Sequence, residues 1–142
     1  MQRNTPESIT ILMADDDADD RMLAADAMKE SRLGNTFRCV EDGQELMDYL
    51  MRRGKYSHGN APRPGLILLD LNMPRKDGRQ ALQEIKSDPE LRRIPVVMFT
   101  TSRRAADMER GLSLGATRFE IKPSSYPALV AFANELADVA RG

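Results

Sequence analysis

A short run of apolar residues that ends in a carboxylate constrains the fold of this chain more than any other feature. The run is Leu66 to Leu69, followed by Asp70, in the stretch LILLDLNMP that ends at Pro74. A continuous apolar run, as opposed to an alternating one, is typical of a strand buried on both faces. Asp70 then falls at the carboxyl end of that strand, the edge where ligands collect in open parallel sheets. Taken alone, the stretch is explained equally well by a functional carboxylate and by one that only exposes the end of a strand to solvent.

Similar apolar runs alternate with helical patterns along the chain. Five strands and five helices in alternation, joined by right-handed crossovers, predict an α/β fold with a parallel sheet covered on both faces. For five such units we expect the flavodoxin-like, doubly wound (βα)5 fold with strand order 2-1-3-4-5. The predicted strands are 9–14, 36–41, 66–69, 95–100 and 118–121, and the predicted helices are 18–33, 44–53, 79–87, 103–114 and one that Ser125 caps.

Length and composition bound the organisation of the chain. With 142 residues we expect one domain over 9–142, preceded by a loose polar tail over 1–8. Charged residues make up 30% of the chain but nearly cancel to a net charge of -1, which argues against nucleic-acid binding. The loop 54–65 holds three glycines and two prolines and is longer than most connections, which is typical of a surface loop with a recognition role.

The lack of long apolar runs and the single cysteine and histidine indicate the cellular compartment and argue against two kinds of catalytic or metal site. No apolar run approaches the ~20 residues that span a bilayer, and the first residues lack the apolar core of a signal peptide. The single Cys39 cannot form an internal disulfide, which fits a reducing compartment. We therefore expect a cytoplasmic protein with no membrane attachment. The single His58 argues against a catalytic triad or a zinc site that needs several histidines.

Polar groups distant in sequence are expected to meet at one edge of the sheet. Strands 1 and 3 are neighbours in the predicted order, and their ends carry Asp15, Asp16 and Asp70. Thr100 ends strand 4 and Lys122 follows strand 5. Carboxylates in close proximity repel one another and need a counter-charge, and all-oxygen ligands suit Mg²⁺. An ammonium and a hydroxyl suit a phosphoryl group, and a carboxylate can act as the nucleophile that becomes an aspartyl phosphate.

Each of these residues also has a structural interpretation. An acidic run before a helix often supplies an N-cap, which applies best to Asp17. A threonine at a strand end is usually explained by β-propensity, and a lysine before a proline is usually a solvated loop residue. Their joint occurrence at four strand ends favours the functional interpretation.

The residues resemble a receiver domain of two-component response regulators over Ile9 to Ala140. The resemblance rests on four motifs in order, ILMADDD, LLDLNMP with a following DG, PVVMFTTS and GATRFEIKP. It implies that Asp70 accepts a phosphoryl group from a sensor histidine kinase and that the protein is no enzyme beyond its own phosphotransfer and autodephosphorylation. The resemblance implies that Asp16, Asp70 and the backbone carbonyl of Asn72 bind Mg²⁺, and that Asp15 binds it through water. It implies that Lys122 binds the phosphoryl group. It also implies that the side chains of Asn72 and Ser102 set the phosphate lifetime.

The resemblance also implies a conformational switch and a partner. Thr100 is expected to turn toward the phosphoryl group while Phe119 moves from an exposed to a buried position. Phe119 stands where the best-known members have tyrosine, so a contact that needs the phenolic hydroxyl is in question. The stretch 49–102 is similar to small receivers paired with phytochrome-type kinases. Such receivers often pair through the fourth helix, fifth strand and fifth helix, a face that here includes Arg103, Arg104 and Phe119. Because no segment follows the fifth helix, output is expected by phosphorylation-dependent protein binding.

Three other interpretations remain on sequence grounds. A haloacid dehalogenase-like phosphatase also uses a strand-end aspartate, and Asp15 and Asp17 match its opening spacing, but Asp19 stands where threonine or valine belongs. A calcium loop would share Asp15, Asp17 and Asp19, but it needs glycine where Asp20 stands. A degenerate receiver that acts only as a docking module would lack part of the acceptor site, which is complete here.

Overall fold

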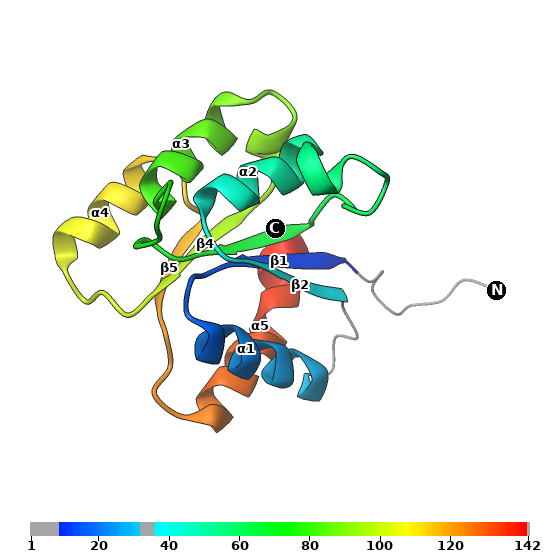
Figure 1. Ribbon diagram of the computed structural model, residues 1–142. Coiled ribbons are helices and arrows are strands. Elements are labelled where there is room, and N and C mark those ends of the chain that lie inside the picture. The colour runs from blue at the N-terminus through cyan, green and yellow to red at the C-terminus, as the bar shows by residue number, and fades with distance from the viewer. Residues whose placement is uncertain (1–8, 32–35, 142) are drawn as a thin grey trace.

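The computed structural model describes residues 9–31 and 36–141, and the expected loose tail over 1–8 lies outside the described residues (Figure 1). Five strands form one parallel sheet in the order β2-β1-β3-β4-β5, so the predicted flavodoxin-like order is confirmed. The strands are β1 (Thr10–Ala14), β2 (Thr36–Val40), β3 (Leu66–Leu69), β4 (Val96–Thr100) and β5 (Arg118–Ile121).

Helices cover both faces of this sheet. In Figure 1, α1 and α5 lie side by side on one face, and α2, α3 and α4 cover the other. The helices are α1 (Ala18–Glu30), α2 (Gly43–Met51), α3 (Gly78–Ser87), α4 (Ala105–Ser113) and α5 (Tyr126–Arg141). Among the described residues, none of these helices combines the length and the apolarity that a membrane crossing requires.

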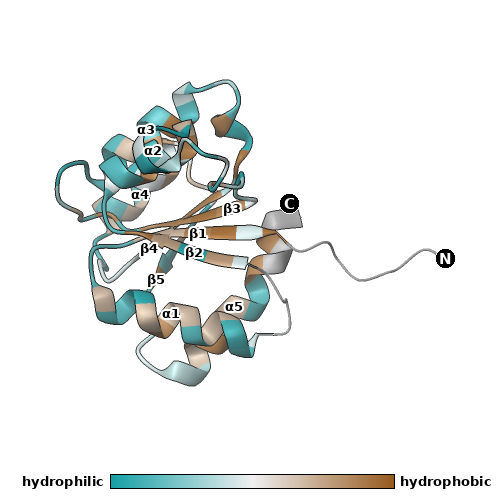
Figure 2. Ribbon diagram, turned by 45° about the vertical axis from the view of Figure 1, so that its right-hand side comes forward, coloured by the Kyte–Doolittle hydropathy of each residue, from teal (hydrophilic) through white to brown (hydrophobic). Residues whose placement is uncertain are grey.

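Alternate residues of the central strands supply two separate cores. On β1, Leu12 and Ala14 face the cluster under α2 and α3, whereas Ile11 and Met13 face the cluster under α1 and α5. Figure 2 shows mostly brown, apolar strands between helices in which hydrophilic and hydrophobic residues are mixed. Burial on both faces explains why β3 and β4 consist of uninterrupted apolar residues.

The register of the sheet places the strand ends level with one another. Ala14 pairs with Leu69, so the residues that follow them leave neighbouring strands at the same height. Thr100 pairs with Ile121 at the other side of the sheet. The loops after these four strands therefore open at one edge, the carboxyl edge of the parallel sheet.

The structure corrects several details of the predicted helices. The first helix ends at Glu30, and its buried stripe is Ala24, Ala27 and Met28. Leu23 lies four residues before Ala27, a spacing that is typical of one helix face. It is nevertheless 46% exposed, because it lies one residue, or about 100°, away from Ala24 around the helix. The fourth helix begins at Ala105 instead of residue 103, after a loop organised by Ser102.

The long loop between α2 and β3 is anchored to the body of the domain. Its first part forms a 3₁₀ turn, Gly54–Tyr56, that the sequence pattern does not indicate. The Tyr56 hydroxyl donates to Glu45 Oε2 at 2.6 Å, and the Tyr49 hydroxyl donates to the carbonyl of Pro62 at 2.8 Å. A second such turn, Leu91–Arg93, follows α3. The 54–65 segment is a surface loop, as predicted, but the two tyrosines fix both of its ends.

Candidate functional site

Three carboxylates converge at the carboxyl edge of the sheet, as predicted. One oxygen from each of Asp15, Asp16 and Asp70 lies within 4.8 Å of the others. Asp15 is completely buried and Asp70 nearly so, whereas Asp16 is exposed. The first two follow β1 and the third follows β3, and these strands are neighbours, so the topology alone brings together residues far apart in the sequence.

The ammonium group of Lys122 balances this charge. Its Nζ donates to Asp15 Oδ2 at 2.6 Å, to Asp20 Oδ2 at 2.7 Å and to Asp70 Oδ2 at 3.3 Å. A lysine ammonium has three N–H donors, and here three carboxylates accept them. Lys122 is therefore the protein's own counter-charge for the acidic cluster.

Local backbone hydrogen bonds fix the acidic side chains. Asp15 Oδ1 accepts from the amide of Asp17 at 2.9 Å, and Asp70 Oδ1 accepts from the amide of Leu71 at 2.7 Å. Asp17 in turn caps α1, because its Oδ1 accepts from the amide of Asp20 at 3.0 Å. The interpretation of Asp17 as an N-cap is thus confirmed, and the two neighbouring acids are left for other roles.

Burial and ion pairing shift the acid–base behaviour of the site. Burial raises the pKa of Asp15 above its ordinary value, although the hydrogen bonds from Lys122 and the Asp17 amide act against this. Burial also disfavours the charged form of Lys122, but the hydrogen bonds to Asp15 and Asp20 and the nearby charge of Asp70 raise its pKa overall. The ammonium is therefore charged at neutral pH.

The loop after β3 is held close to the acidic cluster by two glycines. A Cβ on Gly78 would lie 2.1 Å from the carbonyl oxygen of Asp70, and a Cβ on Gly43 would lie 2.1 Å from the carbonyl oxygen of Lys76. Neither position tolerates a side chain without a backbone shift. The Gly78 amide donates to the carbonyl of Leu71 at 2.8 Å, which closes the turn that contains the exposed Asn72.

An arginine ties this loop to the start of α2. Arg75 adopts a left-handed backbone conformation with φ of 65°. Its guanidinium donates from Nε to Asp42 Oδ2 at 2.8 Å and from Nη2 to Asp42 Oδ1 at 3.1 Å. Asp42 also caps α2, so one carboxylate joins the helix start and the loop after β3.

The other predicted residues lie at the ends of β4 and β5. Thr100 is completely buried, and its carbonyl accepts from the Lys122 amide at 2.8 Å, which joins the two residues across the edge. The Ser102 hydroxyl donates to Asp107 at 2.6 Å, and Asp107 also accepts from Arg79 at 3.0 Å. Phe119 is half-buried, with its ring beside Gly111 of α4, where a Cβ would lie 3.4 Å from the ring.

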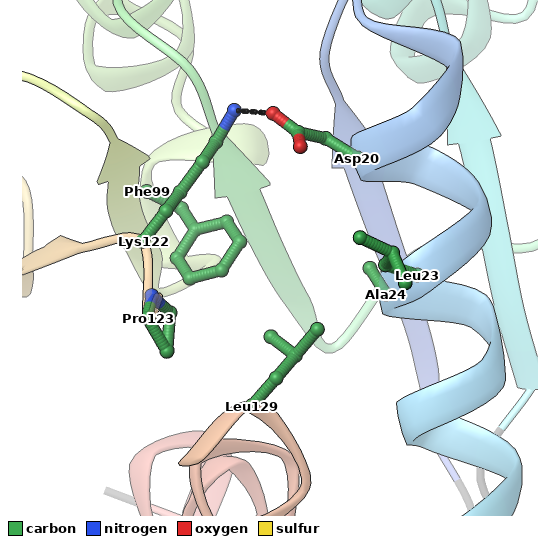
Figure 3. A pocket seen from close by; sticks show the side chains of 7 residues that line it. All are labelled: Asp20, Leu23, Ala24, Phe99, Lys122, Pro123 and Leu129. Carbon is green, nitrogen blue, oxygen red and sulfur yellow. Dashed lines mark hydrogen bonds and ion pairs between the residues drawn. The ribbon is translucent and has the colours of Figure 1, made fainter. Parts of the chain in front are cut away.

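Sequence reasoning misses an acidic residue that contacts the lysine of the site. Asp20, in the first turn of α1, reaches Lys122 across the edge of the sheet (Figure 3). The sequence feature that could have indicated Asp20 is its position in the acidic run 15–20. This run spans the end of the first strand and the first turn of the helix that follows it. In the sequence analysis, Asp15 and Asp16 are candidate site residues and Asp17 is a candidate N-cap. Asp20 is used there only to exclude a calcium loop.

The donor set fits a hard divalent cation. Carboxylate oxygens from Asp15, Asp16 and Asp70 lie close enough to share one ion, and oxygen is the ligand atom that Mg²⁺ and Mn²⁺ prefer. The exposure of Asp16 leaves one side of such an ion open to solvent or to an oxygen of a further ligand.

Comparison with known proteins finds relatives along nearly the whole chain. The family described as response regulator receiver domain matches residues 11–134. Response regulator Rcp1 of Synechocystis sp. is 44% identical over 105 residues, which make up 74% of this chain and 69% of that protein.

Solved structures agree in fold over a similar range. The crystal structure of the phosphorylated cyanobacterial phytochrome response regulator RcpA is 37% identical, with 96% of both chains covered and a TM-score of 0.85. The crystal structure of the Mn²⁺-bound form of response regulator Rcp1 is 36% identical, with 92% of both chains covered and a TM-score of 0.81.

Proposed function

The chain belongs to the response regulator receiver domain family, and from this premise we propose that Asp70 accepts a phosphoryl group from a sensor histidine kinase. The observation that carries the proposal is the convergence of Asp15, Asp16, Asp70 and Lys122 at one edge of the sheet. A nucleophilic carboxylate, a set of oxygen ligands and an ammonium are the parts that phosphoryl transfer to an aspartate requires.

The proposed cation is Mg²⁺, held by Asp16, Asp70 and the backbone carbonyl of Asn72, with Asp15 acting through water. When bound, the ion supplies positive charge to the oxygens of the phosphoryl group. The carboxylate trio supports a divalent site, and the relative Rcp1 has been crystallised in a Mn²⁺-bound form. Lys122 adds a second positive charge beside Asp70.

The transfer itself needs no general base. An oxygen of the Asp70 carboxylate attacks phosphorus and an O–P bond forms. The P–N bond to the donor imidazole breaks, and its electron pair stays on the imidazole nitrogen, which takes up a proton. We propose that Lys122 donates to an oxygen of the arriving group, which its distance of 3.3 Å from Nζ to Asp70 Oδ2 supports. In autodephosphorylation, water attacks the same phosphorus, and inorganic phosphate and the Asp70 carboxylate are the products.

Residues around Asp70 are proposed to set the lifetime of the phosphorylated form and to transmit its state. Asn72 is exposed beside the acceptor, and Ser102 is held by Asp107 in the loop after β4. Thr100 is proposed to turn its hydroxyl toward the phosphoryl group while the half-buried ring of Phe119 moves inward. That movement would change the surface of α4, because Gly111 of that helix lies beside the ring.

We propose a phytochrome-type histidine kinase as the partner and pairing of two copies through α4, β5 and α5. The names of RcpA and of other relatives as phytochrome response regulators support the kinase. The pairing is supported by two exposed apolar side chains on α4, Met108 and Leu112, which are 41% and 44% exposed on the helix that flanks Phe119.

Phosphotransfer from purified kinases tests the proposal. We expect faster labelling of this protein by a phosphorylated phytochrome-type kinase than by unrelated histidine kinases, no labelling of Asp70→Asn, and no transfer without a divalent cation. Binding of the kinase without any labelling would favour a docking module instead. Steady hydrolysis of unrelated phosphomonoesters would favour a phosphatase.

A further inference from the structure

Asp20 contacts the lysine of the site, yet it belongs neither to the carboxylate trio nor to the proposed phosphoryl ligands. Its Oδ2 lies 2.7 Å from Lys122 Nζ, which is closer than the 3.3 Å between that nitrogen and Asp70. The Asp20 side chain is 32% exposed, whereas that of Lys122 is 10% exposed. The pair therefore joins the first turn of α1 to the end of β5 at the mouth of the site.

We propose that Asp20 is a positioning residue that holds the Lys122 ammonium in place for the phosphoryl group while the other two partners of Lys122 change. The inference rests on the proposed phosphorylation of Asp70 and extends it by a residue outside the proposed ligand set.

The donor count of the ammonium leads to this role. Its three N–H groups are taken by Asp15, Asp20 and Asp70, so a phosphoryl oxygen gains a hydrogen bond from Lys122 only when one carboxylate gives one up. The contact with Asp70 is the longest of the three, and Asp70 is also the carboxylate that receives the phosphoryl group. When the N–H that Lys122 donates to Asp70 turns to a phosphoryl oxygen, Asp15 and Asp20 remain to hold Lys122 Nζ.

The metal site separates these two remaining partners. Asp15 belongs to the carboxylate trio that fits a divalent cation, and in the proposed site it would accept from a water held by that ion. That water would compete with Lys122 for the Asp15 oxygens. Of the three carboxylates that accept from Lys122 in the described part of the chain, Asp20 alone lies outside that trio. Its hold on the ammonium therefore persists when both the cation and the phosphoryl group are present.

Packing around the lysine stem explains why such a hold is needed. A cavity of about 40 Å³ lies beside the stem, lined by Phe99, Leu129 and Leu23 together with Asp20 and Lys122 (Figure 3). Figure 3 shows the Lys122–Asp20 ion pair bridging α1 and the chain after β5 beside these apolar side chains. With free space next to the methylene groups, packing alone does not fix the position of Nζ.

The helix itself supplies a matched control. Asp19 and Asp20 are both acidic residues in the first turn of α1, where either one complements the helix dipole. Asp19 is exposed and is not among the three carboxylates that accept from Lys122. Asp19→Asn and Asp20→Asn thus remove the same charge from the same turn, and only the second removes the contact with Lys122.

The test is the rate of phosphorylation by acetyl phosphate at saturating Mg²⁺, a small donor that needs no docking surface. We expect Asp20→Asn to slow labelling about 10-fold, since small errors in placing a charged group reduce the rate steeply. Asp20→Glu, which restores a carboxylate, is expected to recover most of that loss, and Asp19→Asn is expected to stay within about 2-fold of the unmodified protein.

The outcomes separate this inference from the proposed function. Normal labelling of Asp20→Asn, or equal loss in Asp19→Asn and Asp20→Asn, would overturn the positioning role while leaving Asp70 as the acceptor. Failure of Asp20→Glu to recover any rate while its circular dichroism spectrum is unchanged would also overturn it. Absence of labelling in the unmodified protein would overturn both.

Discussion

Replacement of Lys122 by methionine tests how the site balances its charge. Lys122→Met keeps most of the apolar stem but removes the ammonium that three carboxylates share. Asp15 is left fully buried without its ion-pair partner, and Asp70 is left nearly so. No loss is assigned to the Asp20 contact, because the side chain of Asp20 is 32% exposed and water screens its charge.

The expected loss follows from the buried contacts. Removing one partner of a buried ion pair destabilises proteins by about 3–5 kcal/mol, and the partial access of water to this edge favours the lower end. We expect the free energy of unfolding to fall by about 3 kcal/mol at pH 7 without divalent cations. For a chain of this size, that loss corresponds to a melting temperature lower by roughly 10 °C.

The loss is expected to depend on pH and on Mg²⁺. Burial already raises the pKa of Asp15, and removal of Lys122, whose hydrogen bond lowers it, raises that pKa further. A carboxyl whose pKa is raised in the folded state destabilises the fold at high pH, and this cost disappears as the pH falls through the raised pKa toward the ordinary value of 3.8. The deficit of the variant should therefore shrink as the pH is lowered from 7 toward that value. Millimolar Mg²⁺ at pH 7 should also reduce it, because a bound cation replaces the missing charge.

Urea unfolding followed by circular dichroism measures these differences. Lys86→Met is a suitable control, because Lys86 Nζ donates to the carbonyls of Arg92 and Ile94, both at 3.1 Å, and lies outside the acidic cluster. The loss of unfolding free energy in Lys86→Met should be the same with and without Mg²⁺. An unchanged stability of Lys122→Met at pH 7, or a deficit that is the same with and without Mg²⁺, would refute the reasoning.

Three further predictions concern single residues. Gly78→Ala places a Cβ 2.1 Å from the Asp70 carbonyl oxygen, so we expect a loss of about 3 kcal/mol in unfolding free energy and weaker labelling. Gly111→Ala, whose closest contact would be the Met98 side chain at 3.2 Å, should stay within about 1 kcal/mol, because alanine also favours the helix. Asp16→Asn alters an exposed member of the carboxylate trio and should weaken Mg²⁺ binding at least about 10-fold by calorimetry, while unfolding changes by less than about 0.5 kcal/mol. Burial raises the pKa of the Cys39 thiol to about 11, so Ellman's reagent at pH 8 should react roughly 100-fold more slowly with folded than with urea-unfolded protein; equal rates would contradict the burial.

The sheet and the principal site residues were predictable because both follow from chain topology. Uninterrupted apolar runs identify strands buried on two faces, and the run Leu66–Leu69 is a strand with these bounds. Once the order of the strands is known, the residues that follow them must meet at one edge. Asp15, Asp70 and Lys122 needed no other information to be placed together.

Features that depend on side-chain direction were not predictable in the same way. Leu23 fits the helical spacing of a core residue, yet it lies at the flank of α1, because a spacing pattern does not say which of two adjacent residues faces the sheet. The link from Asp20 to Lys122 joins residues 102 positions apart, and it depends on how α1 is rotated over the strand ends.

Two hydrogen-bonded connections near the site, Arg75 to Asp42 and the pair Ser102 and Arg79 to Asp107, also could not be predicted from the sequence. Arg75 reaches Asp42 from a left-handed turn that no glycine or asparagine signals. Ser102 and Arg79 meet on Asp107, so residues from three different segments depend on the relative placement of α3 and α4. Local sequence carries no periodic signal for contacts between long polar side chains on separate elements.

Localisation of the phosphoryl group on the intact protein tests the central claim most directly. The protein is incubated with acetyl phosphate and Mg²⁺, its mass is measured, and the modified residue is identified by fragmentation of its peptides. We predict one phosphoryl group, on Asp70, that is absent when the cation is chelated. A phosphoryl group on Asp15, Asp16 or His58, or labelling that persists without any divalent cation, would contradict this assignment.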